Sequence, residues 1–126
     1  MLFNKLHISN DATSRLRSLR QRTGLTPNLL CRLGLMLSLE EGSVGATKAP
    51  DEDGQEFNAY TLMGDHEGLI NALLRLVEDE DESVSDDELL DRLKSHLHRG
   101  VARLAVRVRA PVEVAQLISA AARVSP

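Results

Sequence analysis

The stretch TGLTPN at residues 23–28 decides how the first part of this chain folds. Gly24 is the residue type that most often follows a helix, because it adopts the left-handed conformation without strain. Thr26 and Pro27 form a strong helix start, with threonine as the cap and proline in the first turn. The stretch therefore predicts one helix that ends before it and a second helix that begins after it.

The residues before this turn predict a short strand followed by a helix. Residues 3–8 alternate in the way that is typical of a strand. Residues 11–22 place Ala12, Leu16 and Leu19 on one stripe at helical spacing. A strand this short is not stable alone, so we expect it to pair with another strand of this chain or with its copy in a second subunit.

The helix that follows the turn is apolar nearly all round. A strip of small side chains (Cys31, Gly34 and Ser38) lies beside its broad apolar face, while Leu35 and Leu39 lie off that face. A helix of this kind is buried on more than one side, and small side chains let another helix approach closely. We therefore expect an interface between subunits that is formed by Leu29, Leu30, Leu33, Gly34, Met36 and Leu37.

Residues 42–126 predict a loop and further helices, so residues 1–126 are expected to form one compact, mainly helical domain. In order, we expect a loop at 42–55, a short strand or extended segment at 56–63, a helix at 65–77, a run of acids at 78–82, a long helix after the capping box of Ser85 and Glu88, and a last short helix from Pro111 to Ala122. Gly100 weakens the long helix, and the pattern leaves open whether residues 99–109 are helix or strand.

Charge is strongly segregated along the chain, although the formal net charge is only −4. Residues 1–39 have a net charge of +5, residues 40–91 of −15 and residues 92–126 of +6. Arg15, Arg17, Arg20 and Arg22 fall within eight residues, and only Asp11 offers an acid at helical spacing. Unpaired like charges repel unless something anionic offsets them, so this cluster is a candidate surface for a phosphate backbone.

The chemistry that an enzyme needs is missing from the sequence. There is no glycine-rich phosphate loop and no pair of thiols for zinc. His96 and His98 are two residues apart on a helix and point in different directions, so we interpret them as surface residues rather than metal ligands. Cys31 lies among leucines and is expected to be a buried, inert thiol. We predict a protein that is not an enzyme and has no metal or cofactor.

The composition argues against several other classes of protein. No window reaches the roughly 18 consecutive apolar residues of a membrane span. One cysteine excludes an internal disulfide, and without a basic-then-apolar export signal the cytoplasm is the expected location. The aromatic side chains are Phe3, Phe57 and Tyr60, with no tryptophan, which argues against a protein that reads single strands by stacking their bases.

Two family resemblances rest on these motifs. The strand, helix, glycine turn and Thr-Pro-Asn helix start in residues 1–41 resemble the ribbon-helix-helix class, whose strands pair across a dimer and enter the major groove. A second resemblance covers most of the chain and is carried by NKL at 4–6, IS at 8–9, LRSL at 16–19, TGLTPN at 23–28, SLEE at 38–41, FN at 57–58, LI at 69–70 and LHRG at 97–100. With these motifs the chain resembles the DndE family, the small subunit of bacterial DNA sulfur modification (phosphorothioation) systems.

The DndE resemblance implies a homotetramer that binds duplex DNA, prefers nicked DNA, and works beside the sulfur-transfer and ATPase subunits of the modification complex. It also implies a lysine-rich binding surface, whereas arginine occupies the corresponding helix here. Our leading hypothesis is a non-catalytic DNA-binding subunit. Its expected phosphate contacts are Lys5, Arg15, Arg17, Arg20 and Arg22.

Two other hypotheses stay open at this point. The first is a dimeric repressor that reads a DNA sequence through Lys5 and His7 on a pair of strands. The second is an adaptor without DNA contact, in which the acidic block from Glu78 to Asp91 docks a basic partner and the arginines dock an acidic one.

Overall fold

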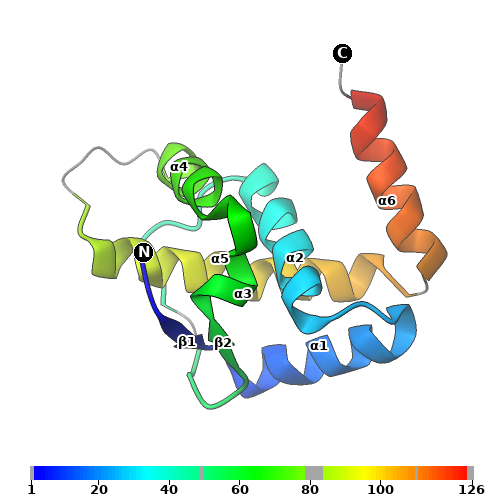
Figure 1. The fold of residues 1–126 in the computed structure, drawn as a ribbon, viewed down its shortest axis with the longest axis horizontal. Coiled ribbons are helices and arrows are strands. Elements are labelled where there is room, and N and C mark those ends of the chain that lie inside the picture. Colours follow the sequence, from blue (N-terminus) through cyan, green and yellow to red (C-terminus); the bar gives the residue numbers. More distant parts are fainter. Residues whose placement is uncertain (1, 49, 79–83, 110, 125–126) are drawn as a thin grey trace.

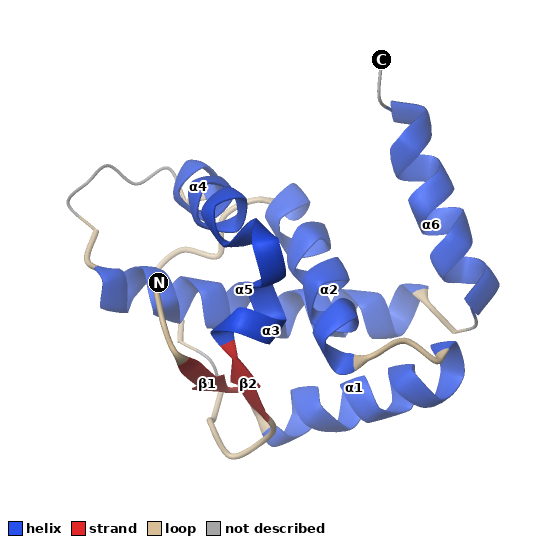
Figure 2. Cartoon of the chain, viewed as in Figure 1, coloured by secondary structure: helices blue, strands red, loops and turns tan. Residues whose placement is uncertain are grey.

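A computed structural model describes residues 2–48, 50–78, 84–109 and 111–124, and this part of the chain is a compact, mainly helical domain with one small sheet (Figures 1 and 2). The elements are β1 (Lys5–His7), α1 (Asn10–Thr23), α2 (Pro27–Glu41), β2 (Glu56–Asn58), α3 (Ala59–Met63), the short 3-10 helix η1 (Gly64–His66), α4 (Glu67–Val77), α5 (Asp86–Arg107) and α6 (Pro111–Val124). The prediction of a mainly helical domain is confirmed.

The turn between α1 and α2 forms as its sequence predicts. Gly24 has a φ of 76°, in the left-handed region, and its N–H donates to the Arg20 carbonyl at 2.8 Å. Thr26 caps α2 by accepting from the Leu29 N–H at 3.3 Å, and Pro27 is the first helical residue. These contacts satisfy backbone groups that each helix end leaves without an intrahelical partner.

β1 pairs with β2 of the same chain, which is one of the two alternatives that the sequence left open. The strands are antiparallel, with Lys5 opposite Asn58, Leu6 opposite Phe57 and His7 opposite Glu56. Leu6 and Phe57 are buried, so the other two pairs lie on the outward face. The pairing across a dimer that the ribbon-helix-helix resemblance implied is therefore not the pairing that β1 makes here.

The segment at 56–63 is mostly helix rather than strand. Only residues 56–58 are extended, because the Asn58 side chain accepts from the Tyr60 N–H at 2.8 Å and starts α3 at Ala59. An Asn at this position is a strong helix cap, and that signal overrides the weak alternation of the following residues.

α2 and α5 cross in the centre of the molecule, and two glycines set their distance (Figure 1). A Cβ atom on Gly100 would lie 1.9 Å from the Gly34 carbonyl oxygen, so the two backbones touch there. Gly100 does not break α5, which runs as one helix to Arg107. Residues 99–107 are thus helix, and Gly100 is needed for packing.

This close crossing turns a different face of α2 inward than the sequence predicts. Leu35 and Leu39, expected off the main face, are buried together with the small strip of Cys31, Gly34 and Ser38. Leu29 and Met36, expected in the main face, are 38% and 39% exposed. The small residues point to the core because α5 lies directly against them, and the leucine-rich side is left partly outward.

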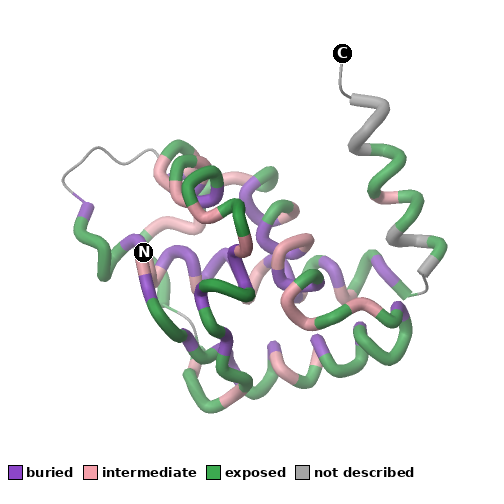
Figure 3. Tube along the Cα trace, in the orientation of Figure 1, coloured by how far each residue is buried: buried purple, intermediate pink, exposed green. Residues whose placement is uncertain are grey.

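The remaining helices complete the fold around this crossing. Figure 3 shows buried positions along the inner sides of α1, α2 and α5 and exposed positions along the outer side of α1. In α4, Ile70 and Leu74 are buried, while Leu69 and Leu76 point outward. α6 leaves the end of α5 and extends away from the other helices (Figure 1). In the described ranges, none of the helices has the length and hydropathy that a membrane span requires.

Candidate nucleic-acid interface

The arginines of α1 lie where the sequence predicts, outside its buried stripe. Ala12, Leu16, Leu19 and Thr23 face the core of the chain. The arginines at 17, 20 and 22 are exposed, and none of them has a hydrogen bond or ion pair with any residue that the structure describes. Their positive charge is therefore presented to solvent and to any ligand of opposite charge.

The other two predicted phosphate contacts lie differently. Arg15 is half-buried, and its Nε donates to Asp11 Oδ2 at 2.9 Å, four residues earlier on the same helix. Lys5 is exposed on the outward face of the sheet, beside the start of α1 and away from Arg20 and Arg22 at its end (Figure 1). The structure therefore gives exposed arginines on both flanks of α1, with Arg17 and Arg20 on one flank and Arg22 on the other, and a separate lysine, rather than one patch of five cations.

Most of the carboxyl-terminal basic residues are engaged inside the chain, although residues 92–126 carry as much positive charge as the start. Lys94 Nζ lies 2.6 Å from Glu52 Oε1, and Arg103 Nη2 lies 2.9 Å from Glu41 Oε1. Arg99 Nη2 donates to the Ser38 carbonyl at 2.7 Å and also to the Gly42 carbonyl, so it caps the end of α2. These cations stabilise the fold and leave α1 as the main exposed basic surface.

A buried polar cluster joins α2, α4 and α5, and it corrects two expectations. His96 was expected at the surface and Glu78 in an acidic block that could dock a basic partner, yet both side chains are fully buried. His96 Nε2 lies 2.9 Å from Glu78 Oε2, and His96 Nδ1 lies 2.7 Å from Ser38 Oγ. Residues 79–82 of the acidic run lie outside the described residues.

Glu78 also holds the chain that follows α2. Its carboxylate accepts from the Ser43 hydroxyl at 3.0 Å and from the N–H groups of Val44 and Gly45, each at 3.1 Å. Arg92 Nη1 lies 3.5 Å from its Oε1. A buried charge is tolerated when it is paired and hydrogen-bonded, and Glu78 meets both conditions.

The hydrogen bonds assign the proton in this cluster. The ionised Glu78 carboxylate can only accept, so the proton of a neutral His96 sits on Nε2 and points to Glu78. His96 Nδ1 then accepts from the Ser38 hydroxyl, whose oxygen also accepts from Arg99 Nε at 2.9 Å. Burial lowers the pKa of His96, and it outweighs the hydrogen bond and charge of Glu78, which raise it. Burial raises the pKa of Glu78, but hydrogen bonds from His96, Val44 and Ser43 outweigh it and hold that pKa below its ordinary value.

The Ser38 hydroxyl, the His96 imidazole and the Glu78 carboxylate form a chain of hydrogen bonds, but their surroundings are those of a structural site. Ser38 and His96 have no exposed surface, so no substrate reaches them. The Ser38 oxygen is already held by Arg99. Cys31 is buried as expected, and burial raises the pKa of its thiol to about 12, which keeps it protonated and unreactive.

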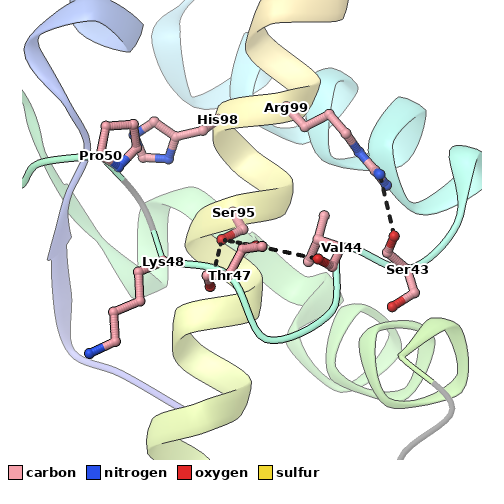
Figure 4. A pocket seen from close by; sticks show the side chains of 8 residues that line it. All are labelled: Ser43, Val44, Thr47, Lys48, Pro50, Ser95, His98 and Arg99. Carbon is pink, nitrogen blue, oxygen red and sulfur yellow. Dashed lines mark hydrogen bonds between the residues drawn. The ribbon is translucent and has the colours of Figure 1, made fainter.

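A groove of about 350 Å³ lies between the loop after α2 and one side of α5 (Figure 4). Its lining includes Lys48, His98 and Arg99. His98 Nε2 accepts from the Ser9 N–H at 2.9 Å and its Nδ1 lies 2.6 Å from the Lys94 carbonyl, so both ring nitrogens are occupied. Because Arg99 is engaged as well, Lys48 is the one lining cation that the described contacts leave without a partner.

The fold and these contacts define a small helical protein with exposed arginines along α1 and a structural rather than reactive interior. A family model described as "DNA sulphur modification protein DndE" matches residues 5–111, so the chain belongs to the DndE family. This confirms the resemblance carried by the sequence motifs. The match ends where α6 begins.

Solved structures of DndE proteins share the fold. The chain is 24% identical to DndE from Escherichia coli B7A, described as involved in DNA phosphorothioation modification, with a TM-score of 0.70 over 81% of this chain and 98% of that one. It is 22% identical to a glycine-to-lysine mutant of DndE involved in DNA phosphorothioation, with a TM-score of 0.69 over 82% of this chain and 99% of that one. The comparison with curated proteins gave no match.

Proposed function

We propose that this protein is a non-catalytic subunit of the DNA phosphorothioation machinery that binds duplex DNA without reading its sequence and prefers nicked DNA. Membership of the DndE family supports a role in DNA sulfur modification. The observation that carries DNA binding is the set of exposed arginines on α1, Arg17, Arg20 and Arg22, which have no partner among the described residues. Guanidinium groups on a helix contact phosphates and position a protein on DNA without reading bases.

The proposed assembly is a homotetramer in the cytoplasm that brings several copies of α1 onto one DNA surface and docks the other subunits of the sulfur modification complex. Its interface uses the outward side of α2, where Leu29 and Met36 are exposed and Leu33 and Leu37 are half-buried. Leu30 and Gly34, also expected in the interface, are buried in the core of the chain itself, so their contribution is to hold α5.

Of the two alternative functions, the geometry favours the adaptor over the repressor. For a repressor, β1 is already paired within the chain, and His7 Nε2 lies 3.6 Å from Glu56 Oε1 on the outward face. For an adaptor, exposed acids at Asp86, Asp87 and Glu88 do form the start of α5. The adaptor is therefore the second candidate, and DNA binding by the isolated protein separates it from the proposal.

The test is binding of the purified protein to intact and singly nicked duplexes of unrelated sequence across a salt series. We expect binding that weakens steeply with salt, is similar for all sequences and is tighter for the nicked duplex. Replacing Arg17, Arg20 and Arg22 by Ala should reduce the slope of log Kobs against log[salt] by about 3 units, because each lost phosphate contact removes about 0.9.

A control variant tests whether the position of the lost cation matters, and not only the lost charge. Arg75→Ala removes a cation of α4 that is paired with Asp86 at 3.4 Å, and it should leave the salt slope unchanged. Absence of binding at low salt would refute DNA binding and favour the adaptor. Tight binding to one palindromic sequence alone would favour the repressor.

A further inference from the structure

We propose that Tyr60 and Lys5 together form a site for one unstacked nucleobase of DNA and its phosphate. This proposal deepens the proposed function and rests on it. It names the feature of the DNA that the surface around α3 recognises, namely a base whose face is exposed at a break in one strand.

The Tyr60 ring is held out into solvent by a fixed support. Tyr60 is 74% exposed, whereas Ala59, Leu62 and Met63 of the same helix are at most 2% exposed. Tyr60 and Thr61 form the exposed side of α3, and a side chain this exposed contributes little to the core. Its position is open to a ligand.

Both ends of α3 are tied down by side chains. The Asn58 side chain accepts from the Tyr60 N–H at 2.8 Å. Arg32 of α2 donates through Nε to the Leu62 carbonyl and through Nη2 to the Thr61 carbonyl, each at 2.6 Å. Because the backbone on both sides of the ring is fixed, a ligand does not have to order it, and less free energy is lost on binding.

Lys5 lies close to this support. The Asn4 carbonyl accepts from the Ala59 N–H at 2.8 Å, and Lys5 stands opposite Asn58 in the sheet. Lys5 is exposed and makes no hydrogen bond or ion pair with any described residue. Asn58, the partner of Lys5, is two residues before Tyr60, so an aromatic face and a cation without a described partner stand on neighbouring segments and offer one surface for a base and one for a phosphate.

The polar surroundings of the ring favour a nucleotide over a protein partner. The residues around Tyr60 in sequence and across the sheet, Asn4, Lys5, Asn58 and Thr61, are exposed and polar. A tyrosine at the centre of a protein interface instead fills a desolvated, well-packed pocket. In an intact duplex the faces of the bases are stacked on one another, so the ring can reach a base face only at a strand break, an end or an unpaired nucleotide.

The composition of the chain provides a direct optical test. Tyr60 is the one tyrosine in the sequence and there is no tryptophan, so tyrosine emission reports on this ring alone. The emission should be followed while the full-length protein is mixed, at one protein per circle, with a relaxed closed minicircle or with the same circle carrying one nick. We expect quenching with the nicked circle and unchanged emission with the closed one.

Three variants give the energetic test. Tyr60→Ala should lower the preference for the nicked over the closed circle by roughly 5-fold to 150-fold, the range for one base stacked on an aromatic ring. Tyr60→Phe keeps the ring and should keep the preference. Leu76→Ala removes an equally exposed apolar side chain from α4, where Leu76 is 75% exposed, and should also leave the preference unchanged.

The outcomes separate this proposal from the function on which it rests. Equal quenching by both circles, or an unchanged preference in Tyr60→Ala, would overturn the role of Tyr60 while leaving DNA binding intact. A change of sedimentation coefficient in Tyr60→Ala, with DNA binding unaltered, would assign the ring to a subunit interface and overturn the base site. Failure of the native protein to bind either circle would overturn both proposals.

Discussion

α1 and α5 both carry several basic residues, yet they use their charges in opposite ways. On α1, Arg17, Arg20 and Arg22 point into solvent without partners among the described residues. On α5, Lys94 and Arg103 are paired with carboxylates of other elements, at 2.6 and 2.9 Å. Similar charge in the sequence thus becomes a ligand-facing surface in one helix and part of the fold in the other.

The number of cations in a segment therefore does not decide whether they pair within the fold or face a ligand. The positions of nearby acids and helix ends decide it. α5 crosses the end of α2 and the chain that follows it, where Glu41, Glu52 and the last carbonyls of α2 need donors. On α1 the acid at helical spacing, Asp11, is already bound to Arg15. The predictions below test this division, from the largest expected effect to the smallest.

Removing the Glu78 carboxylate tests whether the polar contacts of α5 inside the molecule stabilise the fold. Glu78→Ala leaves His96, Arg92 and the turn at residues 43–45 without their shared acceptor. A buried donor left without its acceptor costs about 1–3 kcal/mol, so the loss of these several hydrogen bonds should lower the free energy of unfolding by about 3–5 kcal/mol. Denaturation by urea, followed by circular dichroism, measures the change.

The matched control is Glu40→Ala, which removes an exposed acid at the end of α2. This variant should change the unfolding free energy by less than about 0.5 kcal/mol. A similar small loss for Glu78→Ala would mean that the buried polar cluster does not stabilise the fold. The contribution of α5 to stability would then come from its apolar contacts alone.

Gly100→Ala tests the close crossing that brings the α5 cations to their partners. The added Cβ would lie 1.9 Å from the Gly34 carbonyl oxygen, so the helices must separate. Overpacking of this kind costs about 1–3 kcal/mol, more than the roughly 1 kcal/mol that Ala adds in helix propensity. The control is Gly68→Ala on α4, where the Cβ meets nothing within 4 Å and stability should be kept or slightly raised. Equal thermal midpoints for the two variants would contradict the crossing.

A smaller, pH-dependent effect should come from the same cluster. The pKa of His96 and the pKa of Glu78 both lie below their ordinary values of 6.5 and 4.5. As pH falls, the unfolded chain therefore binds protons at these groups before the folded protein does, and the stability falls through pH 6.5 and again through pH 4.5. Stability contributed by Glu78 is complete above its unfolded pKa and lost as pH falls through its folded pKa.

His96→Gln isolates the upper part of this profile, because glutamine does not titrate. The variant should be less stable overall, and its urea midpoint should depend less on pH between about 5 and 7 than that of the native protein. A variant profile that keeps the full native slope in this window would show that His96 does not cause it.

Local signals in the sequence predicted the helices well. Thr26 and Ser85 cap α2 and α5 by accepting a backbone N–H where the sequence predicts, and Gly24 ends α1. Ser9 and Asn58 cap α1 and α3 in the same way, but neither was predicted as a cap from the sequence. The capping box of Ser85 and Glu88 was foreseen in the sequence, and so was the start of α2 at Pro27. Such signals act over a few residues, so they can be read without knowing the tertiary fold.

The polar and charged side chains that pair inside the fold were not predicted, because their partners lie far away in the sequence. His96 and Ser38 are 58 residues apart, and His96 and Glu78 are 18 apart. One signal was available: His96 falls three residues after Leu93 and one before Leu97, on the apolar stripe of α5. A histidine on an apolar stripe is buried, and a buried histidine requires polar partners.

The smallest expected effect compares one cation from each helix directly. Arg20→Ala and Lys94→Ala remove the same charge from the same molecule, and each should alter the unfolding free energy by less than about 1 kcal/mol. Only Arg20→Ala should lower the slope of log Kobs against log[salt] for duplex DNA, by about 0.9, because Lys94 is held by Glu52. If both variants lower the slope equally, DNA responds to the net charge of the molecule, and α1 is not a distinct binding face. If Lys94→Ala alone lowers it, the DNA lies along α5 and the division between the two helices is reversed.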